Sequence, residues 1–143
     1  MTYVVEPWND EQPLGTVLAK TAAEEFRTLK KYITKVPHKA VSADYTFIQS
    51  DVGKRLVHPS TDTFERAWTV PPNSSVAFAI GSVISVGVRD GAGSVTLTQG
   101  SGVTLRRAGT GATGDLTVSV NGWMTLEKTD TDEWYVYGAN LFG

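Results

Sequence analysis

Apolar residues recur at two different spacings along the chain, and the spacing changes near residue 40. Before that point they fall four and three residues apart, which is the period of one face of an α-helix. After it, apolar and polar residues alternate in short runs, which is the period of a strand with one buried face. The pattern predicts an N-terminal arm and helix at residues 1–39 and a β module at residues 40–143.

The helix is predicted to span residues 22–36. Thr21-Ala-Ala-Glu24 has the spacing of a capping box, in which the threonine and glutamate side chains each accept a hydrogen bond from a free backbone N–H. Pro37 follows the segment, and its ring ends the helix. The apolar residues of the helix have heptad spacing. They form one seam, which consists of Ala22, Phe26, Leu29, Ile33 and Val36.

Residues 1–20 are predicted to form an extended arm, because Pro7, Pro13 and Gly15 interrupt any longer element. The arm carries Trp8 and is ordered only if its apolar side chains dock on a surface. An isolated helix of this length is marginal in water, so the seam also needs a cover. The surface that covers the seam belongs either to the chain's own β domain or to neighbouring subunits. The predicted oligomer or attachment interface comprises Trp8, Ala22, Phe26, Leu29, Ile33 and Val36.

After residue 40, short strands are predicted at intervals of roughly 8–12 residues, which is typical of a sandwich or barrel. Asp90-Gly91 and Asn121-Gly122 are turn sequences typical of hairpins. Parallel neighbours usually need a crossover helix, and no helix is predicted between these strands. The predicted fold class is mainly β, an antiparallel β-sandwich or jelly-roll-like domain preceded by the extended arm and one amphipathic helix.

One side of the alternating strands is predicted to line the core. Val76, Phe78 and Ile80 repeat at every second position, which predicts a strand in this segment. The predicted core residues are Phe78, Ile80, Ile84, Val86, Val88, Val95, Leu97, Val103, Leu105, Leu116, Val118, Val120, Trp134 and Val136.

The composition excludes several kinds of binding and of site. The net charge is −2, so electrostatic binding of nucleic acid is not expected. The chain has no cysteine, which excludes disulfides and thiolate metal ligands. No segment reaches the ~20 apolar residues of a membrane span, and the N-terminus lacks the pattern of a signal peptide, so we expect synthesis in a cytoplasm and no membrane insertion.

No catalytic motif is present in the sequence. The histidines are His38 and His58, and neither belongs to a nucleophile–base or zinc motif. The loop carboxylates Asp130, Asp132 and Glu133 are interpreted as solvated groups, with weak calcium binding as the alternative. We therefore predict a protein that is not an enzyme and has no cofactor and no metal site.

Four aromatic residues near the C-terminus allow two interpretations. They form either core and cross-strand contacts or a platform on which a sugar stacks. These residues are Trp123, Trp134, Tyr135 and Tyr137.

Five blocks of sequence follow one another through the β region. They are Tyr45–Lys54, Thr69–Gly81, Gly91–Leu97, Gly100–Leu105 and Thr131–Gly138. Taken in order, they resemble a β module found in tailed-bacteriophage virion proteins, notably tail-fibre and appendage proteins. The front of the chain, Trp8–Gly15 followed by Ala22–Lys30, looks like the virion-attachment start of phage fibres and spikes.

The resemblance implies a non-enzymatic structural protein of a phage particle, a small fibre, decoration or appendage protein that attaches through its N-terminal region. It would be made in the host cytoplasm and reside in the virion. Its implied partners are other copies of itself, most simply in a trimer because fibre-like appendages are typically trimeric, and other capsid or tail proteins. The alternative is a carbohydrate-binding or host-surface-binding module used in adsorption, whose partner is a glycan of the host surface.

Overall fold

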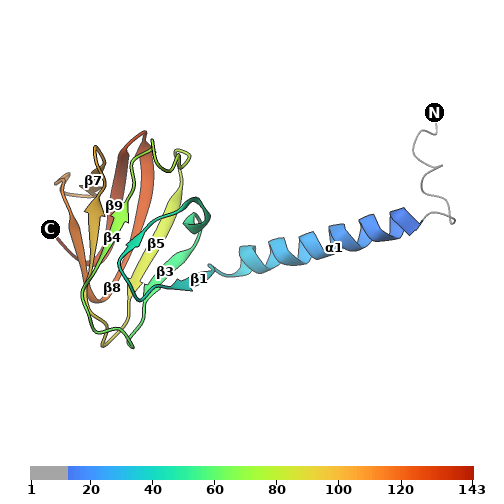
Figure 1. Cartoon of the computed structure of the whole chain (residues 1–143), viewed down its shortest axis with the longest axis horizontal. Coiled ribbons are helices and arrows are strands. Elements are labelled where there is room, and N and C mark those ends of the chain that lie inside the picture. Colours follow the sequence, from blue (N-terminus) through green and yellow to red (C-terminus); the bar gives the residue numbers. More distant parts are fainter. Residues whose placement is uncertain (1–12) are drawn as a thin grey trace. The chain divides into compact units, whose positions relative to one another are not determined.

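The computed structural model describes residues 13–143, with side chains for 21–30 and 34–143. The chain divides into two compact units, residues 1–36 and 37–143. The first contains helix α1 (Pro13–Thr34), and the second contains every strand of the described residues (Figure 1). The predicted mainly β fold, preceded by one helix, is confirmed.

Helix α1 begins upstream of the predicted start and contains 22 residues. Pro13 stands at the first helical position, where the missing N–H of proline costs no intrahelical hydrogen bond. The capping-box start at Thr21 is therefore wrong, and residues 13–20 are helical instead of belonging to an arm. The reason is local, since Leu, Ala and Lys favour a helix there and a single Gly15 costs only about 1 kcal/mol.

The second unit is built from nine strands and a short 3₁₀ helix. In chain order these elements are β1 (His38–Ala40), β2 (Tyr45–Thr46), η2 (Gln49–Asp51), β3 (Arg55–His58), β4 (Arg66–Val70), β5 (Val83–Val88), β6 (Val95–Gln99), β7 (Thr104–Arg107), β8 (Leu116–Asp130) and β9 (Glu133–Phe142).

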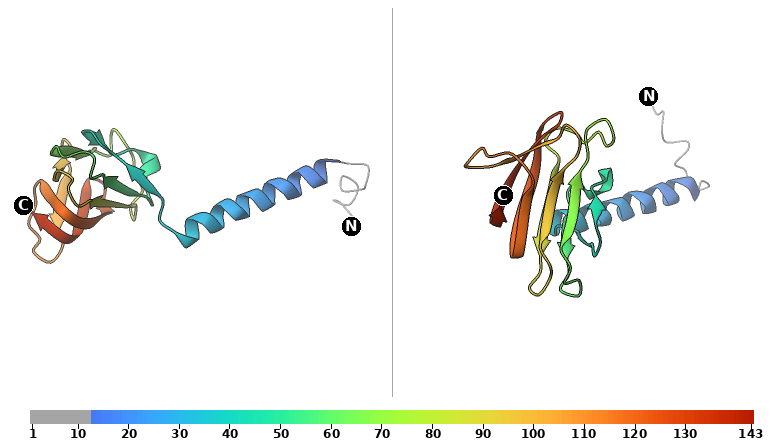
Figure 2. Two further views of the ribbon diagram at one scale, coloured as in Figure 1. Left: turned by 90° about the horizontal axis from the view of Figure 1, so that it is seen from below. Right: turned by 60° about the vertical axis from the view of Figure 1, so that its left-hand side comes forward.

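All nine strands belong to one curled sheet with β8 at its centre (Figure 2). The first part of β8 pairs with β6, which places Leu116 opposite Leu97. Its later part pairs with β5, which places Met124 opposite Val86. On the other edge of β8, the strand β9 runs antiparallel along both parts. The sheet therefore has two halves, β1-β3-β5 and β2-β4-β6, that share the β8–β9 hairpin.

Successive strands alternate between these two halves. The pairs β1–β3, β3–β5, β2–β4 and β4–β6 are all parallel, as is β7–β9. The sheet is therefore mixed, and the prediction of purely antiparallel pairing is wrong. The prediction required crossover helices between parallel neighbours. Here the crossover from one strand to its parallel neighbour is a strand of the opposite half.

Two predicted hairpin turns have other roles. The turn at Asp90-Gly91 joins β5 to β6, which do not pair, and Gly91 has a φ of 80°. Asn121 has a φ of 62° and lies inside β8, where the register with β9 shifts between Val118 and Trp123. This irregularity falls where β8 changes its partner from β6 to β5. The chain turns between Asp130, where β8 ends, and Glu133, where β9 begins.

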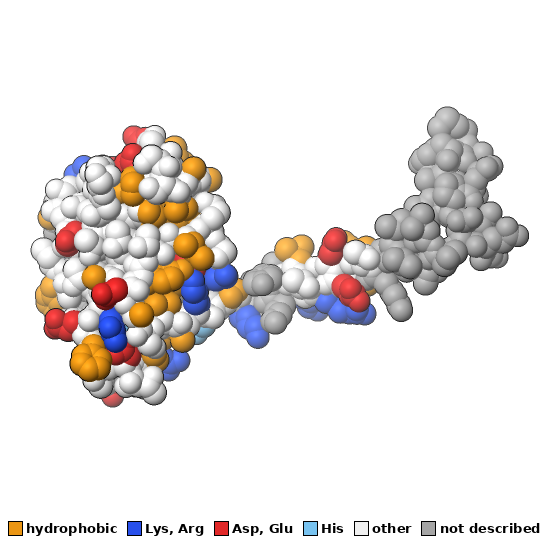
Figure 3. All heavy atoms as spheres, viewed as in Figure 1, with side chains coloured by type: hydrophobic (Ala, Val, Ile, Leu, Met, Phe, Trp, Pro, Cys, Tyr) orange, Lys and Arg blue, Asp and Glu red, His pale blue; other side chains and the backbone are white. Residues whose placement is uncertain are grey.

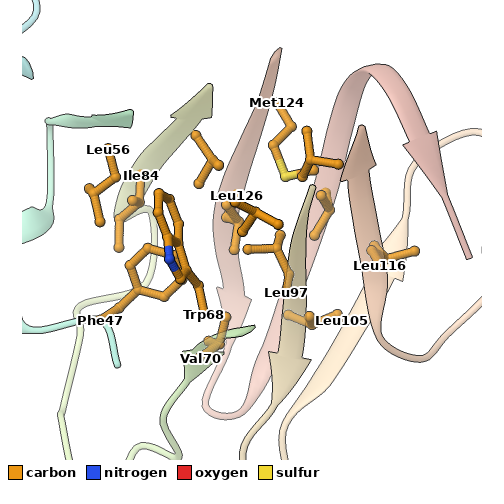
Figure 4. Close-up of a cluster of buried hydrophobic side chains, with 14 of the residues drawn as sticks. Phe47, Leu56, Trp68, Val70, Ile84, Leu97, Leu105, Leu116, Met124 and Leu126 are labelled. Carbon is orange, nitrogen blue, oxygen red and sulfur yellow. The ribbon is translucent and has the colours of Figure 1, made fainter. Parts of the chain in front are cut away.

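The core lies between the two halves of the sheet. Rings from opposite halves meet in it, with His58 of β3 and Trp68 of β4 6.2 Å apart between centroids. Figure 4 shows Phe47 and Trp68 beside Ile84 and Leu56 in this cluster. The sequence pattern missed several of the largest members, namely Phe47, Leu56, Trp68, Met124 and Leu126.

Two predicted core residues lie elsewhere. Ile80 is 67% exposed, and Val120 is partly exposed beside the irregularity in β8. The segment 76–80 is a loop instead of the predicted strand. Phe78 is nevertheless buried, and its ring lies 5.3 Å from the ring of Trp134. The other predicted core residues are all buried.

The two isoleucines at positions 80 and 84 provide a matched test of this core. Ile84 is fully buried, so Ile84→Ala should lower the free energy of unfolding by about 2–5 kcal/mol. Ile80→Ala is the same chemical change at an exposed site and should alter it by less than about 0.5 kcal/mol. Urea denaturation measures both values. Equal losses would contradict the observed assignment of Ile80 to a surface loop.

Candidate functional site

The outer face of the β1-β3-β5 half and its neighbours β8 and β9 is the candidate site. Strand register places two rows of residues on it. The first row is Arg55, Ser85, Thr125 and Tyr137. The second row is Val57, Gly87, Trp123 and Ala139. Their sequence neighbours Leu56, Val86 and Leu126 are buried in the core, so the two rows face away from it.

Trp123 is the central side chain of this face. A Cβ atom built on Gly87 would lie 2.4–2.8 Å from atoms of the indole ring, so the ring occupies space that only a glycine leaves open. The guanidinium carbon of Arg55 lies 4.8 Å from the ring centroid, within the range of a cation–π contact. Trp123 remains 36% exposed and Tyr137 43% exposed. The face therefore presents one fixed and one more exposed aromatic ring to solvent.

A shallow cavity of about 290 Å³ lies over β1 and β3 on the same face. Ala40 and Val57 supply its small apolar side chains, and His38 and Arg89 supply basic ones. Pro59 and Ser60 complete the lining. Val57 is buried but lies outside the core cluster, so outer-face side chains cover it. We call the set His38, Arg55, Val57, Arg89, Trp123 and Tyr137 the outer-face patch.

The outer-face patch contains two arginines, Arg55 and Arg89. Within the part of the chain whose side chains are described, neither Arg55 nor Arg89 forms an ion pair. The Nε atom of Arg55 is buried and has no hydrogen-bond partner among the residues that the structure describes. The terminal Nη atoms of both guanidinium groups therefore retain capacity for a contact with an anion.

A buried ionic cluster joins the end of β3 to the start of β4. Asp62 accepts hydrogen bonds from Arg66 Nε at 2.7 Å and Arg66 Nη2 at 3.1 Å. The ring of His58 is fully buried, with Nε2 3.0 Å from Asp62 Oδ2 and Nδ1 2.8 Å from the carbonyl oxygen of Gly93. Both ring nitrogens therefore lie within hydrogen-bond distance of an oxygen atom.

The surroundings of Asp62 fix its protonation state. Hydrogen bonds from Arg66 and then from His58 hold the pKa of the Asp62 carboxyl well below its ordinary value of 3.8. Phe64 adds a backbone N–H at 3.2 Å. Both nitrogens of His58 and both oxygens of Asp62 are engaged in these contacts. The cluster therefore acts as a structural link between the two halves of the sheet and has no free acid or base.

A second buried carboxylate connects β1, β2 and η2. Asp51 is fully buried and accepts hydrogen bonds from Lys39 Nζ at 2.8 Å, Tyr45 OH at 2.7 Å and Ile48 N at 3.0 Å. Burial works to lower the pKa of Lys39, but hydrogen bonds to Asp51 and Tyr45 outweigh it and raise that pKa. Burial is the main cause of the raised pKa of Tyr45. At neutral pH Lys39 is thus charged and Tyr45 is protonated, so neither is available as a base.

Lys128 forms hydrogen bonds with the loop that contains Phe78. Lys128 is 2% exposed, and its Nζ donates to Asn73 Oδ1 at 2.6 Å and to the carbonyl oxygen of Phe78 at 2.8 Å. Asp132 Oδ1 accepts from the backbone N–H of Asn73 at 2.7 Å. These contacts tie residues 73–78 to the end of the β8–β9 hairpin.

The predicted interface residues fall on α1 or beside it. Ala22, Phe26 and Leu29 are exposed, the last two by 72% and 54%, and their spacing puts them on one face of the helix. Val36 is 49% exposed and follows the end of α1, so it is not a helical member of the seam. Trp8 and the side chain of Ile33 lie outside the described residues. The interface itself stays a prediction.

The loop carboxylates have separate partners. Asp130 accepts from the N–H of Thr131, Asp132 from that of Asn73, and Glu133 from Arg106. Among the residues described, no three His, Cys, Asp or Glu side chains group as metal ligands. The described helix is not long and apolar enough to cross a membrane.

Comparisons with protein-family models, curated proteins and solved structures found no match to this chain. The phage resemblance therefore remains a prediction based on the sequence blocks.

The depressed pKa of Asp62 predicts a pH-dependent stability. Its contribution is complete above the ordinary carboxyl pKa of 3.8 and is lost as the pH falls through the lower folded value. Asp62→Asn should therefore be less stable than the unsubstituted protein at neutral pH, and the difference should shrink in acid. Urea denaturation over a pH series measures it. The exposed Asp90→Asn is the control, and a pH-independent difference for Asp62→Asn would contradict the assignment.

Loss of the Lys128 ammonium should loosen residues 73–78. Lys128→Met leaves the Asn73 side chain and the Phe78 carbonyl without their donor, which should cost about 1–3 kcal/mol of unfolding free energy. Amide hydrogen exchange should accelerate at Gly81, whose N–H donates to the carbonyl of Lys128. Lys54→Met, at a partly exposed position, is the control. Equal effects of the two substitutions would show that the buried ammonium does not hold this loop.

Proposed function

We propose that the protein is a non-enzymatic structural component of a bacteriophage particle, a small fibre, decoration or appendage protein. Its N-terminal region would assemble with other copies and with capsid or tail proteins, and its β unit would be the displayed module. Five ordered sequence blocks and the attachment-like front support the phage assignment through their resemblance to virion proteins. The observation that supports a structural role comes from helix α1.

The exposed apolar seam of α1 is the observation that carries this proposal. Phe26 and Leu29 are 72% and 54% exposed, although each would gain from burial. A helix whose apolar side chains remain in water is marginal by itself, and packing of that face stabilises it. The 22 residues of α1 also provide more length for an interhelical seam than the predicted segment.

Other copies of this chain are the proposed cover for the seam. Ala22, Phe26, Leu29 and Ile33 have the alternating four- and three-residue spacing of a coiled-coil seam. A closed, symmetric bundle buries identical seams against one another. The preference for three copies comes from the resemblance to fibre-like appendages. In this arrangement the helices assemble, and each carries one β unit.

The internal chemistry of the β unit supports a structural role. Its buried Asp51, Asp62 and Lys128 each have hydrogen-bond partners within the same unit. Such groups connect loops and strands and are not exposed for reaction with a substrate. Figure 3 shows charged side chains of both signs dispersed over the visible face of the β unit, without an extended field of one charge.

Oligomeric state tests the proposal. We expect light scattering on the purified full chain to give a trimer mass. Phe26→Asp with Leu29→Asp should produce folded monomers, because unpaired carboxylates buried in a bundle are costly. Thr28→Asp adds the same group off the seam and should leave the oligomer intact. A folded monomer at micromolar concentration for the unsubstituted chain would refute self-association.

The location in a virion needs a separate experiment. Particles produced without this protein should lack a capsid or tail feature in negative-stain images. Particles of unchanged appearance that fail to adsorb would instead support host recognition as the main role.

Loss of the β fold in the double aspartate variant would place the helical seam against its own β unit.

A further inference from the structure

We propose that the outer-face patch binds a saccharide that bears a carboxylate. The site is independent of the assembly role of α1, because all of its residues belong to the β unit. Two observations lead to it. One is an exposed indole fixed over a strand glycine, and the other is a pair of arginines that have no acidic partner among the described side chains.

The aromatic part of the patch is held in place before any ligand arrives. The ring of Trp123 lies over Gly87, and Arg55 contacts the ring at 4.8 Å. Both side chains come from paired strands, which fix their separation better than loops would. A fixed ring loses little conformational freedom when a ligand packs on it. This arrangement favours a small, flat apolar surface, such as the C–H face of a sugar ring.

The polar groups around Trp123 match the hydroxyl-rich edge of a saccharide. Ser85 and Thr125 lie in the adjacent row, with their hydroxyl oxygens 3.5 Å apart. Ser60 belongs to the cavity on the same face. Hydroxyl groups both donate and accept, so they pair with sugar hydroxyls in either direction. Tyr137 adds a second exposed ring at the end of the row that contains Arg55.

The charge of the patch selects an acidic sugar over a neutral one. Among the residues whose side chains are described, Arg55 and Arg89 make no ion pair. A guanidinium group fits the two oxygens of a carboxylate in a bidentate contact. A long nucleic acid is disfavoured, because the chain has a net charge of −2. The cavity of about 290 Å³ is the size of a small subsite beside the aromatic surface.

Titration of the full chain with defined oligosaccharides tests the site. The probes are short oligomers of galacturonate, of glucuronate and of sialic acid, with a neutral galactose oligomer of equal length and oligoglutamate as controls. The indole N–H signal of Trp123 and amide signals of β3, β5 and β8 report binding by NMR. We expect at least one acidic oligosaccharide to shift these signals and the two controls to leave them unchanged.

Substitutions then assign the contacts. Arg55→Gln should weaken acidic-oligosaccharide binding roughly tenfold or more, since it removes a charge-assisted contact. Arg55→Lys should not restore full affinity, because lysine lacks the planar fork. Trp123→Ala should also weaken binding, and thermal denaturation checks that each variant is folded. Arg107→Gln, which makes the same charge change on β7, and Phe64→Ala, an exposed aromatic outside the patch, should bind normally.

Several results would overturn the proposal. They are no binding of any acidic oligosaccharide at millimolar concentration, equal binding of the neutral oligomer, and equal binding of oligoglutamate, which would indicate an acidic-peptide site. An equal loss in Arg107→Gln would indicate non-specific charge attraction. Dissociation of an oligomer by Arg55→Gln or Trp123→Ala would identify the patch as a subunit contact. Loss of self-association through α1 would leave this binding intact, which separates the two proposals.

Discussion

The β unit depends on the antiparallel ladder between β8 and β9. Both halves of the sheet attach to the other edge of β8, with β6 on its first part and β5 on its later part. The left-handed residue Asn121 lies between these parts, where the ladder shifts its register. One long, irregular strand thus replaces the two separate strands that a simpler sandwich would need. Without this strand the two halves would have no common hydrogen-bonded partner.

Local patterns predicted the positions of strands better than their partners. The alternation of Ile84, Val86 and Val88, and that of Val95 and Leu97, predicts strands, and these residues lie in β5 and β6. Alternation is a property of neighbouring residues, whereas pairing joins segments far apart in the chain. The Asn121-Gly122 sequence likewise does not determine which strands pair. Its left-handed backbone at Asn121 suits a hairpin turn and a strand irregularity equally. The segment at 76–80 alternates as a strand would, but only Phe78 reaches the core.

The candidate site was less predictable than the fold. Gly87 lies in a segment rich in valine and isoleucine, and a glycine in a strand can indicate a close approach by another group. The identity of that group depends on the register between β5 and β8, which places Trp123 beside it. Asp51 and Asp62 were missed because a carboxylate in sequence is usually a surface residue. Only the folded chain brings them their cationic partners.

The alternating path of the chain has a consequence for folding during synthesis. Strands β1 to β6 leave the ribosome before β8, yet β5 and β6 find their shared partner only after residue 116. Such a topology has many contacts between distant residues, which slows folding because long loops must close first. Helix α1 uses hydrogen bonds between residues four apart and is synthesised before the β unit. A nascent chain can therefore present its helix to neighbouring chains while its β unit is still incomplete.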